Sequence, residues 1–172
     1  MLIWNKRRSF ALGLGLALLL AAGAYFITKT RRSSKLIIGA VEEVVIEPWG
    51  IKLTARVDSG AATSSLYVNN VKAQDKQISF CFPVKFGGQC MTTQLLEWRK
   101  VKSSDGIEER RAVVELEIRL GRSRFRTQFT LDDRAHMSFP MLLGRRALKG
   151  RFLVDVERTN AAWEEPAGDT PE

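Results

Sequence analysis

The sequence contains a single histidine, His136, and no Gly-x-x-x-x-Gly-Lys-Ser/Thr segment. A hydrolytic zinc site uses about three protein ligands, commonly with two histidines among them. A nucleotide-binding phosphate loop needs the missing glycine-rich segment. His136 lies beside Met137 in a predicted turn, and we interpret it as an ordinary surface or hydrogen-bonded residue. The sequence therefore predicts no metal and no cofactor, with zinc hydrolysis as the lesser alternative.

Cysteine is nearly absent as well, because Cys81 and Cys90 are the only two. Phe86-Gly87-Gly88 lies between them, and a hairpin turning there would place the two cysteines opposite each other. In an oxidising compartment they could close a disulfide across a small loop. The alternative is a pair of half-buried thiols without a bond, and the sequence leaves both open.

Acidic residues are missing from residues 1–35, which hold seven of the 27 Lys and Arg residues. Residues 10–27 carry no charge and, at about 18 residues, just reach the length of a membrane-spanning helix. Basic residues flank both sides, so the charge rule does not fix the orientation. We expect an uncleaved anchor with the following domain outside the cytoplasm. The alternatives are a signal peptide cleaved near Ala22-Gly23-Ala24 and an inverted anchor.

The formal net charge of +8 does not indicate a nucleic-acid partner. Residues 36–159 hold 20 basic and 15 acidic side chains of mixed order, unlike the clustered basic footprint of a phosphate-binding surface. Residues 160–172 contain four acids, no base and little apolar content, so we expect a disordered acidic tail. The predicted domains are 1–35, 36–159 and 160–172.

Short strands dominate the remaining sequence. Apolar and polar residues alternate through 51–57 and through a hairpin that turns at Gly121-Arg122-Ser123, as expected for strands with one buried face. One short helix is predicted at 145–149, ended by Gly150. The pattern predicts a small all-β barrel or sandwich, with strands at 36–38, 41–46, 51–57, 77–84, 91–98, 113–120, 125–131 and 152–156.

The predicted strand 51–57 leads into Asp58-Ser59-Gly60. This arrangement suits an aspartic peptidase, because the strand presents a carboxylate, the hydroxyl braces the loop and glycine lets the chain turn. Alone, the tripeptide is a common turn. About 80 residues later, Met141-Leu142-Leu143-Gly144-Arg145 follows, and the two segments together resemble the two signatures of the retropepsin family. The chain is most similar to its bacterial branch, often labelled putative ATP-dependent zinc protease, through 58–64, 131–137 and 150–155.

This resemblance covers about 38–159 and implies a small closed retropepsin-like barrel. It implies a homodimer in which Asp58 of each subunit activates a water, Ser59 braces the neighbouring subunit and Gly60 forms the turn. Leu143 and Gly144 would pack behind that loop. Ala61, Thr63 and Arg145 would bind substrate or support the loop. The expected function is a membrane-tethered aspartic endopeptidase that acts on a peptide or protein substrate. The expected location is a bacterial inner membrane, with the peptidase domain in the periplasm. The alternative is a non-catalytic peptide-binding module on the same fold.

The sequence departs from the family pattern at two positions. Ala62 stands where relatives carry a basic residue or an acid that pairs with the helix arginine, so Arg145 needs another partner. The candidates are Asp132, Asp133 and Asp155. Tyr67 stands where bacterial relatives often carry histidine. Two loops, at 86–89 and 104–106, are candidates for a flap over the substrate.

Overall fold

The computed structural model describes residues 35–102 and 108–164. The predicted anchor at 10–27 and the candidate flap loop at 104–106 lie outside these ranges. Within them, no helix has the length and apolar character to cross a membrane. The predicted division of the chain into three domains stays a prediction.

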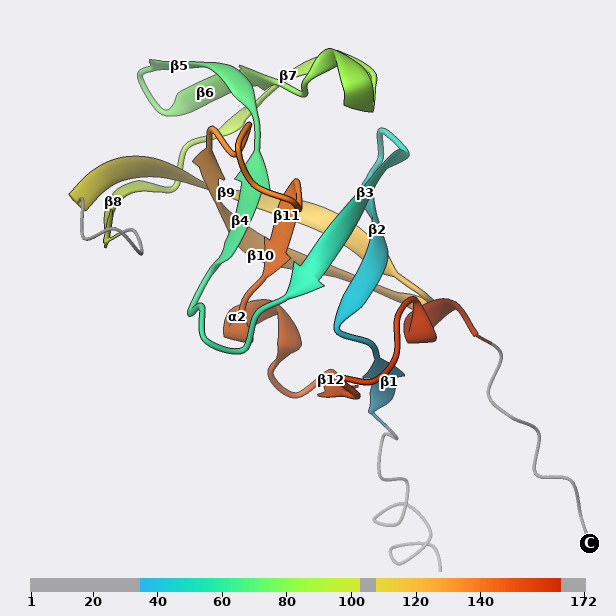
Figure 1. Cartoon of the computed structure of the whole chain (residues 1–172). Helices are drawn as coiled ribbons and strands as arrows, with labels where there is room; N and C mark the ends of the chain where they lie inside the picture. Colours follow the sequence, from blue (N-terminus) through green and yellow to red (C-terminus); the bar gives the residue numbers. More distant parts are fainter. Residues whose placement is uncertain (1–34, 103–107, 165–172) are drawn as a thin grey trace, which may run out of the picture. The chain divides into compact units, whose positions relative to one another are not determined.

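Six strands close into a barrel (Figure 1). β10 pairs with β4, the ladder continues through β11, β3 and β2 to β9, and β9 pairs back onto β10. β8 (Glu97–Lys102) adds to the outer edge of β9. The prediction of a small closed all-β barrel with one short helix, α2 (Arg145–Leu148), is confirmed. The six barrel strands are β2 (Val41–Glu47), β3 (Ile51–Val57), β4 (Ser64–Tyr67), β9 (Glu108–Leu120), β10 (Ser123–Asp132) and β11 (Met141–Leu143).

The alternating sequence pattern explains the core. In β3, Ile51, Leu53 and Ala55 are buried while the residues between them are exposed. Successive strand residues point to opposite faces, so one face packs inward. The predicted hairpin turning at Gly121 is also present, with both strands longer than predicted. The largest fully buried side chains include Phe80, Phe82, Phe129, Ile118 and Leu120.

A second sheet of three strands joins β5 (Asn69–Gln74), β6 (Gln77–Cys81) and β7 (Cys90–Gln94). Cys81 and Cys90 are register partners on β6 and β7 and form a disulfide with a Cα separation of 3.9 Å. This answers the question that the sequence left open. The predicted strand 77–84 ends early, because the chain turns at Pro83 into a short 3-10 helix, η1 (Val84–Phe86).

The predicted strand 91–98 is wrong, since the structure has two strands there. β7 pairs with β6, whereas β8 pairs with β9 of the barrel. The backbone N–H groups of Leu95 and Leu96 donate to Lys76 and Val113 respectively, so the chain changes sheets between these two residues. The local order of apolar and polar residues does not mark such a change.

The predicted disordered tail begins too early. Residues 160–164 are ordered around a 3-10 helix, η2 (Ala161–Trp163), with Ala161 and Ala162 each 5% exposed. A Cβ on Gly121 would lie 2.0 Å from the Ala162 carbonyl oxygen, so η2 packs directly on that glycine. Because two alanines carry little apolar surface, the composition of residues 160–172 did not indicate that η2 packs against the barrel. β1 (Leu36–Ile38) and β12 (Phe152–Val154) form a separate parallel pair.

Candidate active site

The loop at 58–63 begins where β3 ends, beside α2 (Figure 1). The Asp58 N–H donates to the carbonyl oxygen of Leu143 at 2.9 Å. Its Oδ1 accepts hydrogen bonds from the N–H groups of Gly60 at 2.9 Å and Ala61 at 3.2 Å. These contacts fix the orientation of a half-buried carboxyl group within its own loop.

The second sequence signature packs against this loop. Leu143 is fully buried, and the Gly144 N–H donates to Ser64 Oγ at 3.1 Å. A Cβ on Gly144 would lie 2.6 Å from the Thr63 carbonyl carbon, so only glycine fits. The structure thus brings Asp58, Leu143 and Gly144 together, as the resemblance implied.

Arg145 contacts the loop through backbone carbonyl groups. Its Nη1 donates to Ser59 O at 2.8 Å and Gly60 O at 2.6 Å, and its own N–H donates to Ala61 O at 2.9 Å. The predicted pairing with an aspartate is therefore wrong. At the start of α2 the side chain lies directly against the loop, where two carbonyls are within reach.

The three candidate aspartates have other partners. Asp132 pairs with Arg111 and Arg134. Asp133 accepts from the Ala135 N–H at 3.1 Å, and Asp155 accepts from the Glu157 N–H at 3.1 Å. The carboxylates of Asp133 and Asp155 thus each accept a backbone N–H within their own turn.

Next to the loop, one face of β4 and β10 carries polar side chains that we call the polar row. Ser65 is the register partner of Thr130, and Tyr67 is the register partner of Asp132. The next pair along this face is Thr63 and Gln128. The Arg99 guanidinium joins them, since it donates to Thr63 Oγ1 at 2.7 Å and to Gln128 Oε1 at 3.3 Å. Alternate strand residues share a face, so the row consists of Thr63, Ser65, Tyr67, Gln128, Thr130 and Asp132.

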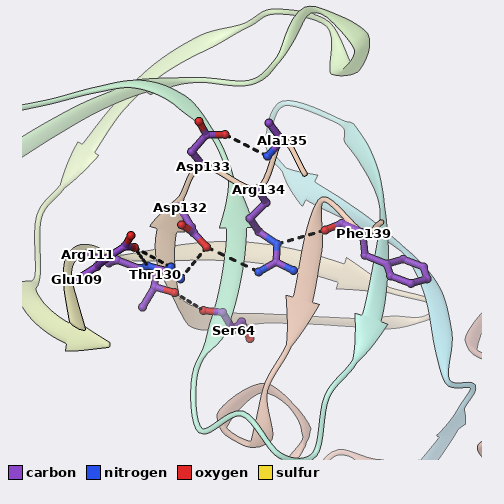
Figure 2. Close-up of polar contacts among 9 residues, drawn as sticks. All are labelled: Ser64, Glu109, Arg111, Thr130, Asp132, Asp133, Arg134, Ala135 and Phe139. Atoms are coloured by element: carbon purple, nitrogen blue, oxygen red, sulfur yellow. Dashed lines mark hydrogen bonds and ion pairs between the residues drawn. The ribbon is translucent and has the colours of Figure 1, made fainter. Parts of the chain in front are cut away.

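Arginines lie at both ends of the polar row. At the Thr63 end, Arg99 is joined by Arg146, which donates to Gln128 Oε1 at 2.5 Å. At the other end, Asp132 lies between Arg111 at 2.6 Å and Arg134 at 3.8 Å (Figure 2). Arg134 also donates from Nε to Phe139 O at 3.2 Å.

Burial dominates the electrostatics at the Asp132 end. It raises the pKa of Asp132, and the positive charges of Arg111 and Arg134 only partly offset this effect. Burial likewise lowers the pKa of Arg134, against the opposing influence of Asp132 and of Asp58.

Ser65 differs from its neighbours in the polar row. The side chain is 7% exposed, and among the residues that the structure describes its Oγ alone is a buried side-chain polar atom without a hydrogen-bond partner. The adjacent Ser64 accepts from Gly144, and Thr130 Oγ1 donates to Ser64 O at 3.2 Å. Leu142 lies beside Ser65 on the next strand.

The loop at 82–90 lies at the Tyr67 end of this face. Phe86 packs edge-on against Tyr67 with ring centroids 6.4 Å apart, and Lys85 Nζ lies 5.4 Å from the Tyr67 ring. Within residues 35–102 and 108–164, no cluster of three or more His, Cys, Asp or Glu side chains is suited to hold a metal ion.

Sequence reasoning missed most of the polar row. Arg99 lies just beyond the predicted strand 91–98, Arg146 lies in the predicted helix 145–149, and Ser65 lies in no predicted strand, and none of the three was given a role. The stretch 131–137 was noted for its likeness to relatives, but no role followed for Arg134. A signal exists only in the alternation of Thr63, Ser65 and Tyr67, which indicates a polar face on a buried strand.

Residues 37–165 match a protein family described as "Retropepsin-like aspartic endopeptidase RimB". Two curated relatives are named "Probable alpha-L-glutamate ligase". One is from Parasynechococcus marenigrum, 37% identical over 132 residues, and one is from Shewanella pealeana, 34% identical over 131 residues. These matches cover 72% and 71% of this chain but only 28% and 29% of the relatives. The chain thus spans less than a third of their length.

A solved structure is also similar. It is the Legionella pneumophila protein Lpg0085, described as of unknown function, with a TM-score of 0.64 and 27% identity. The match covers 75% of this chain and 99% of that protein.

The function predicted from the sequence, a membrane-tethered aspartic endopeptidase working as a homodimer, is wrong in the light of these relatives. They are named for joining α-L-glutamate, which is a different activity from that of a membrane-tethered endopeptidase. The homodimer and the membrane location themselves stay predictions, because the described residues test neither.

Proposed function

Because the chain belongs to the RimB-like family of retropepsin-like aspartic endopeptidases, we propose that it hydrolyses α-glutamyl peptide bonds, with Asp58 as the proton-accepting carboxylate. The family description supports hydrolysis of a peptide bond. The names of the curated relatives support α-linked glutamate as the chemical group involved. The membrane tether and the shared dimer site form no part of this proposal.

The observation that carries the proposal is the geometry of the Asp58 loop. A carboxylate accepts the proton that an attacking water loses, provided that it is held in a fixed orientation. Oδ1 of Asp58 is held by two backbone N–H groups. The water oxygen would bond to the carbonyl carbon as Asp58 takes one water proton. The C–N bond would then break as Asp58 returns this proton to the leaving amine nitrogen, which restores the carboxylate. Each released product would be an ordinary carboxylate or amine.

The polar row supports an acidic substrate. Arg99, Arg111, Arg134 and Arg146 all direct guanidinium groups to one face beside the loop. Arginine binds carboxylates through paired, charge-assisted hydrogen bonds. A peptide with glutamate side chains matches this surface in charge.

The test is cleavage of synthetic peptides by the full chain, followed by mass spectrometry. Peptides ending in α-linked glutamates are compared with versions carrying glutamine or γ-linked glutamate. We expect cleavage of the α-linked glutamyl peptides and loss of at least about a hundredfold in rate for Asp58→Asn. Asp75→Asn, in an exposed turn, is the matched control and keeps the rate.

Two outcomes would overturn the proposal. One is wild-type protein that cleaves none of these peptides, and the other is full activity in Asp58→Asn with an unchanged melting temperature. Binding of the peptides without cleavage would instead favour a peptide-binding module.

A further inference from the structure

We propose that the polar row forms a pocket for one side-chain carboxylate of the substrate, with the Ser65 hydroxyl and the Arg99 guanidinium as its donors. This inference rests on the proposed function, because it names the group that selects glutamyl peptides. It makes Ser65 and Arg99 specificity-determining residues, with no part in bond breaking.

The first argument is the unpartnered hydroxyl of Ser65. Burying a hydroxyl group without a hydrogen bond is unfavourable, and such a group in a folded protein needs an explanation. Its neighbours are committed elsewhere, since Ser64 bonds to Gly144 and Thr130 bonds to Ser64. The Oγ atom is fully covered, so an incoming carboxylate would provide the acceptor that Ser65 lacks only once the groups that cover this hydroxyl move aside.

The second argument is the position of Ser65 between two groups of arginines. Thr63, which Arg99 contacts, and Tyr67, the partner of Asp132, each lie two residues from Ser65 on the same face. Two residues along a strand span about 7 Å. A carboxylate that accepts from Ser65 is therefore within reach of the long Arg99 side chain.

The third argument is that two arginines beside the row are paired with exposed glutamates. Arg99 pairs with Glu97, and Arg111 pairs with Glu109, each two residues earlier on the same strand. Both glutamate side chains are 52% exposed, whereas the arginines are 25% and 15% exposed. Exposed ion pairs contribute little to stability, so a substrate carboxylate can replace Glu97 readily.

The charges set the number of carboxylates that fit. Four arginines contact the row, and the carboxylates paired with them are three. Arg146 is the one that contacts an amide, Gln128, in place of an acid. Arg146 is therefore the arginine of the row with which a further carboxylate can pair, and a single glutamate side chain supplies one.

The pocket lies next to the proposed catalytic loop. Leu142, beside Ser65, precedes Leu143, whose carbonyl holds the Asp58 backbone. A residue bound at Ser65 would thus be a close neighbour of the bond positioned at Asp58.

The experiment measures kcat/KM for peptides in which each glutamate around the cleaved bond is replaced singly by glutamine. For the wild-type chain we expect one position where glutamate is favoured by about tenfold or more, as for a hydrogen bond to a charged group. Ser65→Ala and Arg99→Gln should each reduce that ratio to near one. Ser79→Ala and Arg124→Gln, a serine and an ion-paired arginine elsewhere, should leave the ratio unchanged.

A general loss of activity lowers kcat/KM for the glutamate and the glutamine peptide alike, so it leaves their ratio unaffected. An unchanged ratio in Ser65→Ala and Arg99→Gln would overturn the pocket while leaving the proposed function intact. If the wild-type chain cleaves no peptide, titration calorimetry in the Asp58→Asn chain gives the same comparison from binding alone. Two results together would then support the pocket although the proposed function has failed. The Asp58→Asn chain would bind the glutamate peptide more tightly than the glutamine peptide, and adding Ser65→Ala would abolish this preference.

Discussion

The hydroxyl of Ser64 accepts the backbone N–H of Gly144 at 3.1 Å, across 80 residues of sequence. This bond joins the strand that follows the Asp58 loop to the glycine behind it. Both groups are buried. The two sequence signatures are therefore physically one structure, and the bond between them is open to direct test.

Ser64→Ala should destabilise the fold by about 1–3 kcal/mol, because it leaves the buried Gly144 N–H without an acceptor. Urea unfolding followed by tryptophan fluorescence measures this change. A variant as stable as wild type would mean that the bond does not hold the two segments together.

Ser65→Ala, one residue along, should have the opposite effect. Its hydroxyl has no partner to lose, and removing an unpaired buried hydroxyl should leave stability unchanged or raise it by about 1 kcal/mol. The same unfolding experiment provides the comparison. A loss as large as that of Ser64→Ala would show that Ser65 has a structural partner and would weaken the pocket proposed around it.

The sequence predicted the fold well where burial follows a simple period. Strand 51–57 has the predicted bounds because its alternation matches one buried face. The division of 91–98 into β7 and β8 was missed because both strands are locally regular, and only long-range pairing with different sheets separates them. The docking of η2 was missed for a similar reason, since it depends on Gly121 and Glu42 elsewhere in the chain.

Glu42 should make stability fall as pH rises. The side chain is fully buried and accepts hydrogen bonds from the N–H groups of Gly39 and Ala162. Burial raises its pKa above the ordinary 4.5, and these bonds offset that only in part. The folded state therefore binds the proton more tightly than the unfolded chain. The stabilisation is complete below pH 4.5 and is lost as pH rises through the folded pKa.

This dependence is tested by measuring the free energy of unfolding between about pH 4 and pH 8, since the Glu42 carboxyl group loses its proton above its ordinary pKa. Glu42→Gln should flatten the decline, leaving the part due to Asp132, whose pKa burial also raises. Glu43→Gln, at a half-exposed neighbouring position paired with Lys52, is the control and should keep the wild-type slope. Equal slopes in wild type and Glu42→Gln would contradict the assignment.

Arg145→Lys should reduce activity more than stability. A single nitrogen, Nη1, donates to both Ser59 O and Gly60 O, and the lysine nitrogen stands on a shorter side chain that does not reach the Nη1 position. Small displacements of a catalytic loop cost about ten- to a hundredfold in rate. We expect that loss in kcat/KM for α-glutamyl peptides with a melting temperature close to wild type, because Arg145 is exposed. Lys149→Ala at the end of the same helix should be neutral, and equal rates in both variants would exclude a role for Arg145.

Only part of the candidate site could be predicted from the sequence. Asp58 stands in one signature and Leu143 and Gly144 stand in the other, and the family resemblance carried by these two segments implied that they pack together. Arg99, Ser65 and Arg134 come from three separate segments. Their common face depends on the register between β4 and β10, which no local pattern specifies.

β4 is hydrogen-bonded along both edges, to β10 on one side and to β11 on the other. A ligand over the polar row therefore cannot join the strand ladder, which is how many proteins bind extended peptides. If the polar row binds substrate as proposed, recognition depends on side chains alone. Selectivity and folding would then be encoded by different atoms of the same residues, and a single codon change at Thr63, Ser65 or Tyr67 would alter what the protein prefers while the barrel is inherited intact.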